Sequence, residues 1–248
     1  MSTPPLSVQL YTVRDAVTAD ADAAFTRLAE IGFRSVELYD FVDRAAQYKS
    51  ALSASGLTPS SAHASLLGKD VVPVFEAAKS LGIRTVIDPM VEASRWEKSD
   101  DVVAIADELN GIAAIAADLD LTVGYHNHWW ELASAVDGTN ALEAFADNLD
   151  PSVILEIDTY WSAVGGVDPV GLLERQGDRV RFIHVKDGDI SRDNTKQVAV
   201  GSGRMPVLDI LAAAPSATRV VELDDFAGDV FDALADSVAF LIANGESL

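Results

Sequence analysis

Four histidines occur in the chain, and each stands at the end of a short apolar run. They are His63, His126, His128 and His184. Acidic residues close similar runs in the segments ILEIDTYW (154–161) and RVVELDD (219–225). Imidazole and carboxylate groups bind divalent metal ions and transfer protons near neutral pH. Buried strands that carry such groups at their carboxyl ends are typical of α/β-barrel active sites, so the pattern predicts an enzyme.

Alternate residues of a strand share one face, and this period groups the candidate residues further. Asp158, His184 and Glu222 stand at corresponding ends of three successive predicted strands, where we expect them to converge on one metal ion. His126, on the strand before, is the expected fourth ligand. The chain contains no cysteine, so nitrogen and oxygen atoms must bind the ion. Such a set suits Mn²⁺, our first choice, and also Mg²⁺, Co²⁺, Fe²⁺ or Zn²⁺.

Eight predicted strands, each followed by a predicted helix, must position these groups. The strands cover residues 7–12, 35–39, 59–65, 84–89, 123–132, 154–161, 181–189 and 219–225. Regular alternation of strand and helix calls for a parallel sheet. The first strand lacks the glycine-rich turn of an open nucleotide-binding sheet. We therefore predict an α/β fold, a single (β/α)8 TIM barrel domain over residues 1–248.

The chain is strongly acidic, with 39 Asp and Glu against 18 Lys and Arg and a formal net charge of −21. This charge repels a phosphate backbone, so nucleic acid is not an expected partner. The first residues, MSTPPLS, lack the features of a signal peptide, and no apolar run approaches the roughly 20 residues that cross a bilayer. We therefore expect a cytoplasmic protein without a membrane partner.

Seven short motifs, in the order VELY, SAH, YHNHWWE, DTYW, HVKDGD, VGSG and VELDD, occur between about residues 9 and 226. They resemble those of the sugar phosphate isomerase/epimerase family, the xylose isomerase-like TIM barrels of the AP endonuclease family 2 superfamily. The resemblance implies one divalent ion held by Glu, Asp, His and Glu of the fifth to eighth strands. Those positions are His126, Asp158, His184 and Glu222, so His replaces the first Glu. Glu131, five residues on, is the alternative ligand.

Two further positions depart from the family pattern. Trp161 stands three residues after Asp158, where the dinuclear endonuclease branch has a metal-binding His. The resemblance therefore implies a mononuclear centre. Arg204 ends the loop GSGR, where the family usually has an acidic residue, so we expect Arg204 to contact the substrate.

The resemblance also implies roles for the remaining residues of the site. The metal would bind the carbonyl oxygen and a neighbouring hydroxyl oxygen of the substrate and stabilise an enediolate. Glu156 is the expected base, or else a buried carboxylate paired with Lys186. Lys186 would stabilise the developing oxyanion, and His128 would carry protons.

Four more residues are expected at the substrate. Glu37 would bind a sugar hydroxyl or orient His63, and His63 would bind the substrate directly or support a neighbour through a hydrogen bond. Trp129 and Trp161 would form apolar walls for a sugar ring, unless they only pack between loops.

Four functions compete under this interpretation. The first is an isomerase or epimerase of carbohydrate metabolism, acting on a sugar, keto-sugar or polyol. The second is a lyase, resembling inosose dehydratase, that eliminates water or a glycoside leaving group from a keto-cyclitol or 3-keto sugar. An AP endonuclease and a non-catalytic sugar-binding barrel are less expected. The family's barrels often pair through their helical faces, so a homodimer is a further expectation.

Overall fold

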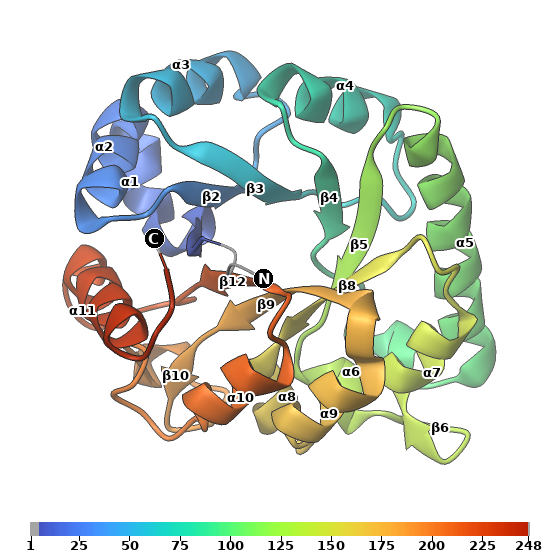
Figure 1. Cartoon of the computed structure of the whole chain (residues 1–248). Coiled ribbons are helices and arrows are strands. Elements are labelled where there is room, and N and C mark those ends of the chain that lie inside the picture. Colours follow the sequence, from blue (N-terminus) through green and yellow to red (C-terminus); the bar gives the residue numbers. More distant parts are fainter. Residues whose placement is uncertain (1–4, 248) are drawn as a thin grey trace.

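A closed barrel of eight parallel strands lies at the centre of the computed structural model, which describes residues 5–247 (Figure 1). Its strands, in spatial order, are β1 (Ser7–Gln9), β2 (Ser35–Leu38), β3 (Thr58–His63), β4 (Thr85–Asp88), β5 (Thr122–His126), β8 (Ile154–Asp158), β9 (Val180–Val185) and β12 (Thr218–Val221). Parallel pairing of β12 with β1 closes the ring. The predicted (β/α)8 barrel is therefore confirmed. The prediction of one domain over 1–248 also covers residues 1–4 and 248, which lie outside the described residues.

Helices surround the barrel on its outer face (Figure 1). They are α1 (Arg14–Ala19), α2 (Ala21–Ile31), α3 (Ala45–Ser55), α4 (Val72–Leu81), α5 (Ser99–Ala117), α6 (Trp129–Ala133), α7 (Ala141–Asn148), α8 (Thr159–Val164), α9 (Pro169–Gln176), α10 (Val207–Ala213) and α11 (Val230–Ala243). Short 3-10 helices cover Leu10–Val13, Ala93–Trp96, Gly177–Arg179 and Asn194–Lys196. Within residues 5–247, no helix is long and apolar enough to cross a membrane.

Two small hairpins stand outside the barrel. One pairs β6 (Ala135–Val136) with β7 (Thr139–Asn140), and the other pairs β10 (Asp187–Gly188) with β11 (Gln197–Val198). The chain ends of the described part meet, because the backbone nitrogen of Leu6 donates to the carbonyl oxygen of Ser247.

Several barrel strands are shorter than the sequence predicts. The first ends at Gln9, whose side chain accepts a hydrogen bond from the backbone nitrogen of Tyr11 and starts a 3-10 turn. The sixth barrel strand, β8, ends at Asp158, whose carboxylate accepts from the backbone nitrogen of Trp161 and caps α8. Polar side chains at the strand ends thus bond to the following backbone, and this competes with continued strand pairing.

A layer of apolar side chains lies inside the barrel under the polar strand ends. It consists of Ile87, Ile154, Phe182 and Val220. Ile154, Phe182 and Val220 stand two positions before Glu156, His184 and Glu222, respectively. Each apolar residue therefore shares the inward face of its strand with the polar residue that follows it. This layer keeps the base of the polar cluster apolar, which strengthens electrostatic interactions there.

Asp187 anchors the segment that follows β9. Its buried carboxylate accepts hydrogen bonds from the backbone nitrogens of Gly188, Gly201, Gly203 and Met205, at 2.8–3.0 Å. A Cβ at Gly203 would overlap the Asp187 carboxylate and the backbone nitrogen of Gly188. Only glycine allows this close approach.

Replacing Gly203 with alanine is therefore expected to lower the free energy of unfolding by about 1–3 kcal/mol, measured by urea denaturation. Gly111→Ala is the matched control, because Gly111 lies within α5 and a Cβ there meets nothing within 4 Å. The control should raise stability by about 0.5–1 kcal/mol. Equal urea midpoints for the two variants would contradict the anchoring role of Asp187.

Candidate active site

The four histidines lie together at the carboxyl-terminal end of the barrel. His63 and His126 are the last residues of β3 and β5, His184 lies near the end of β9, and His128 is the N-cap residue of α6. A cavity of about 770 Å³ opens above them. Its polar wall includes Gln9, His63, His126, His128, Glu222 and Asp224. The volume is typical of a small-molecule site.

Glu156 stands at the centre of the histidine cluster. Its Oε2 lies 2.6 Å from His63 Nε2, 3.0 Å from His126 Nδ1 and 3.2 Å from His184 Nε2. Burial raises the pKa of Glu156, but the charges of His184 and His63 and hydrogen bonds from the rings outweigh burial and hold this pKa well below its usual value. Glu156 is therefore ionised. The alternative pairing with Lys186 is not found.

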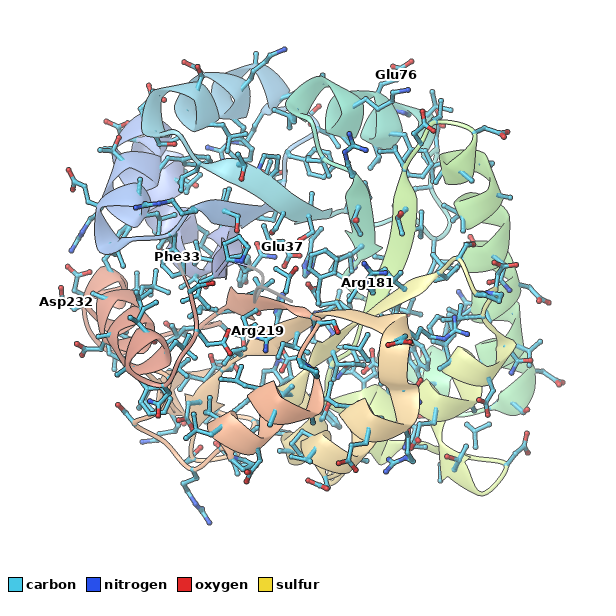
Figure 2. All side chains as sticks on the ribbon, viewed as in Figure 1. Phe33, Glu37, Glu76, Arg181, Arg219 and Asp232 are labelled. Carbon is cyan, nitrogen blue, oxygen red and sulfur yellow. The ribbon has the colours of Figure 1, made fainter. Side chains whose placement is uncertain are left out.

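Glu37 supports the same cluster from β2. Its Oε1 lies 2.7 Å from His184 Nε2 and 3.2 Å from His63 Nε2, and it accepts a hydrogen bond from Gln9. Figure 2 shows this side chain directed into the barrel, whereas exposed Glu76 and Asp232 point outwards. Glu37 is fully buried, and burial together with the charge of Glu156 raises its pKa. The structure thus places Glu37 behind the histidines, outside the cavity lining.

Lys186 forms a second charged cluster beside the first. Its Nζ lies 2.9 Å from Asp158 Oδ2, 2.6 Å from Glu222 Oε2 and 2.9 Å from Asp224 Oδ2. Burial lowers the pKa of Lys186, but the three carboxylates outweigh it and raise the pKa well above the usual value. Burial also raises the pKa of Asp158, to about 6, against the opposing charge of Lys186. Lys186 is therefore a fixed positive charge in this site.

Two overlapping groups of side chains could hold a metal ion, and in each group the ligand atoms lie within 4.8 Å of one another. One group is Asp158, His184 and Glu222, which are three of the four predicted ligands. The fourth, His126, belongs to the other group, with His63, Glu156 and His184. His126 Nε2 lies 3.8 Å from Asp158 Oδ2. Burial and the charge of His184 lower the pKa of His126 to about 3, so its ring is neutral.

The donor atoms fit a divalent cation. All candidate ligand atoms are nitrogen or oxygen, and the six residues of the two groups bring imidazole and carboxylate groups together. Glu156 Oε1 is buried and has no hydrogen-bond partner among the described residues. An unpaired buried polar atom costs about 1–3 kcal/mol, and a bound cation would offset that cost.

Glu131 does not join either ligand group. Its Oε1 accepts a hydrogen bond from the Tyr125 hydroxyl at 2.8 Å, and its Oε2 accepts from the backbone nitrogen of His128 at 2.9 Å. The second bond is part of a capping box at the start of α6. Burial raises the pKa of Glu131 to about 8. The alternative that Glu131 is a metal ligand finds no support, because its two carboxylate oxygens accept hydrogen bonds from the Tyr125 hydroxyl and the His128 backbone nitrogen.

Tyr125→Phe is expected to destabilise the protein by about 1–3 kcal/mol, because Glu131 loses a buried hydrogen-bond donor. Tyr48→Phe provides the matched control, since the buried Tyr48 hydroxyl has no hydrogen-bond partner among the described residues. Thermal unfolding of both variants measures the difference. Equal losses of stability would show that the bond to Glu131 contributes nothing.

Aromatic residues form the side walls of the cavity. Trp129 and Trp161, both predicted at the substrate, line it together with Trp130. The ring of His128 stacks on Trp130 with centroids 4.3 Å apart. Burial holds the pKa of His128 well below its usual value.

The structure does not bring Arg204 to the cavity. Arg204 is exposed, and its backbone nitrogen is bonded to the Gly188 carbonyl beside the β10–β11 hairpin. Arg192 lines the cavity instead, with its guanidinium 3.3 Å from the centroid of the Trp129 ring. Gln9 and Arg192 are site residues that sequence reasoning did not assign. Asp224 lies two residues after Glu222 on the same strand face, a spacing that predicts a place beside the metal ligands.

A family model described as "Xylose isomerase-like TIM barrel" matches residues 25–214, more than half of the chain. The chain belongs to this family. The predicted family is thereby confirmed.

Individual relatives are more distant. An inosose dehydratase of Geobacillus kaustophilus is 32% identical over 95 residues, which are 38% of this chain and 28% of that protein. A sugar phosphate isomerase/epimerase of Parabacteroides distasonis has a crystal structure that matches with a TM-score of 0.85 and 23% identity, covering 99% of this chain and 96% of the other. The structure of an IOLI protein with a zinc atom matches with a TM-score of 0.70 and 14% identity, covering 98% and 100%.

Proposed function

We propose that the protein is a metal-dependent lyase that removes water from a keto-cyclitol or keto-sugar. The observation that carries this proposal is the placement of His63 between the cavity and the buried carboxylate of Glu156. His63 lines the cavity, and its Nε2 lies 2.6 Å from Glu156 Oε2. Its Nδ1 makes no hydrogen bond to the described residues, so that nitrogen is available to a substrate.

His63 is the group that we expect to move the proton. Glu156 is fully buried and outside the cavity lining, so it acts through His63 rather than as the base that the sequence suggested. The ionised carboxylate fixes the ring and stabilises its protonated form, as a carboxylate does behind a catalytic imidazole. A divalent ion held by Asp158, His184, Glu222 and His126 would supply the positive charge that polarises the substrate carbonyl.

Elimination is the outcome that the proton-transfer groups favour. His63 takes the proton from the carbon next to the carbonyl, a C=C bond forms, and the same ring protonates the departing hydroxyl group, which leaves as water. Epimerisation needs a second acceptor on the opposite face of the substrate. Glu222 and Asp224 line the cavity, but both are paired with Lys186. The name of the inosose dehydratase relatives supports the same reaction.

Isomerisation is the second candidate, because it shares the first step. A single imidazole can return the proton to the neighbouring carbon on the same face. The fold of the sugar phosphate isomerase/epimerase from Parabacteroides distasonis agrees with this alternative, although that likeness concerns the fold. The roles expected from the sequence for Lys186 and His128 would be the same in both reactions.

Product analysis separates the two reactions. The protein is incubated with Mn²⁺ and 2-keto-myo-inositol or a 3-keto-glucoside, and the products are resolved by mass spectrometry. The proposed lyase gives a product lighter by one water molecule, whereas an isomerase gives a product of unchanged mass. Complete recovery of unaltered substrate with every divalent ion tested would contradict both reactions.

Other expectations from the sequence stay predictions. They are Mn²⁺ as the preferred metal, a cytoplasmic location, pairing into a homodimer, and the absence of nucleic-acid and membrane partners.

A further inference from the structure

The residues that line the cavity fall into two groups by their chemistry, called here the polar half and the apolar half. The polar half contains the histidines and carboxylates described above. The apolar half is formed by loops after the first four barrel strands and by α4, and it includes Tyr11, Tyr39, Val42, Val74 and Met90. A sugar that reaches the metal ligands and His63 lies in the polar half, so the apolar half faces another part of the ligand.

The size of the cavity agrees with a ligand larger than one sugar. A volume of about 770 Å³ would hold roughly 25 water molecules at about 30 Å³ each. A six-carbon sugar or cyclitol has about half that number of non-hydrogen atoms, and covalent bonding packs them more closely than liquid water. A single sugar therefore leaves much of the cavity unfilled.

The apolar half is also partly open to solvent. Met90 is 56% exposed and Tyr11 is 41% exposed, and both line the same cavity. The rings of Tyr11 and Tyr39 meet edge to face with centroids 5.6 Å apart. Grouped large apolar side chains at the mouth of a cavity typically mark a surface that a ligand covers.

The charges of the cavity do not suit a phosphate group. Asp40, Glu222 and Asp224 line it, and Arg192 is the only Arg or Lys among the described lining residues. The Arg192 guanidinium is stacked on Trp129. Lys186, buried nearby, is already surrounded by three carboxylates. Phosphate sites normally present several donors from Arg, Lys or backbone nitrogens.

We propose that the substrate is an uncharged sugar or cyclitol that carries an aromatic substituent, rather than a free sugar or a sugar phosphate. The sugar occupies the polar half, and the aromatic group packs against Tyr11, Tyr39 and Met90. This proposal rests on the proposed function only in placing the sugar beside His63. It concerns binding preference, which can be measured without turnover.

Isothermal titration calorimetry in the presence of Mn²⁺ tests the proposal. The probes are phenyl and methyl β-D-glucopyranoside, the corresponding galactopyranosides, and glucose 6-phosphate. We expect at least one phenyl glycoside to bind tenfold or more tightly than its methyl counterpart, with a more negative heat-capacity change, because apolar surface is buried. Glucose 6-phosphate should bind no more tightly than the methyl glucoside. Equal affinities of phenyl and methyl glycosides, or no binding of any phenyl glycoside, would overturn the proposal.

A pair of matched variants locates the preference. Met90→Glu places a charge at the apolar half and should reduce the phenyl-to-methyl affinity ratio at least fivefold. Leu208→Glu makes the same kind of change at a side chain that is 48% exposed on α10 and outside the cavity lining, so the ratio should be retained. Equal ratios in both variants would show that the aromatic group does not lie against Met90.

The two proposals fail separately. Preferential binding of phenyl glycosides without conversion of any keto-substrate would support the binding inference and contradict the lyase. Conversion of a free keto-cyclitol with no phenyl preference would support the lyase and overturn the binding inference.

Discussion

Replacing Glu156 with glutamine is expected to reduce kcat for the converted keto-substrate by about 10²- to 10⁴-fold, with little change in KM. The substitution keeps the size of the side chain but removes the negative charge that lies 2.6 Å from His63 Nε2. The neutral amide no longer stabilises a protonated His63. Steady-state kinetics on the metal-loaded protein measure the effect.

Glu143→Gln is the matched control for this change. Glu143 pairs with Arg175 on the outside of the barrel, and removal of a partly exposed pair of this kind changes stability by about 1 kcal/mol or less. Its kcat should equal that of the unmodified protein. Glu156→Asp should recover part of the lost activity, because it restores the charge. Full activity of Glu156→Gln, with unaltered thermal unfolding, would exclude a role for the Glu156–His63 pair.

Replacing His184 with alanine should strongly weaken metal binding. His184 belongs to both candidate ligand groups, so its loss removes a ligand whichever group holds the ion. We expect elemental analysis of the unmodified protein, loaded with Mn²⁺ and desalted, to give about one divalent ion per chain. The metal affinity of the His184→Ala variant should be at least about 10²-fold lower than that of the unmodified protein.

His184→Ala also removes the imidazole that separates Glu37, Glu156 and Glu222, at a cost of about 3–5 kcal/mol. Glu222→Gln therefore serves as a second variant, since it removes a ligand and preserves side-chain size. His128→Ala is the control, because His128 lies in neither ligand group. Equal metal content in all three variants and the unmodified protein would refute the assigned centre. No ion in the unmodified protein would favour a non-catalytic sugar-binding barrel.

The chemistry of the site combines two clusters with different roles. The histidines around Glu156 include His63, the proposed proton-transfer residue, whereas Lys186 and its three carboxylates provide a fixed arrangement of charge. The apolar layer of Ile87, Ile154, Phe182 and Val220 lies beneath both. Because water is excluded from that side, each charge depends on its protein partners.

The sequence by itself determined the barrel and the ends of its strands that carry chemistry. Both follow from local patterns, since the strand period of two sets which residues share a face, and parallel strands bring their carboxyl ends to the same edge. His63, His126, His184 and Glu222 could therefore be placed at one end of the molecule before any contact was known.

Only the tertiary structure decided which groups meet. Glu156 and His63 are 93 residues apart, and their bond depends on the closed ring of strands. The paths of the loops likewise place Arg192 in the cavity lining and Arg204 outside it. They also place Glu131 in the capping box of α6. These outcomes depend on the packing and hydrogen bonds of segments far apart in the chain, which no period or spacing in the sequence encodes.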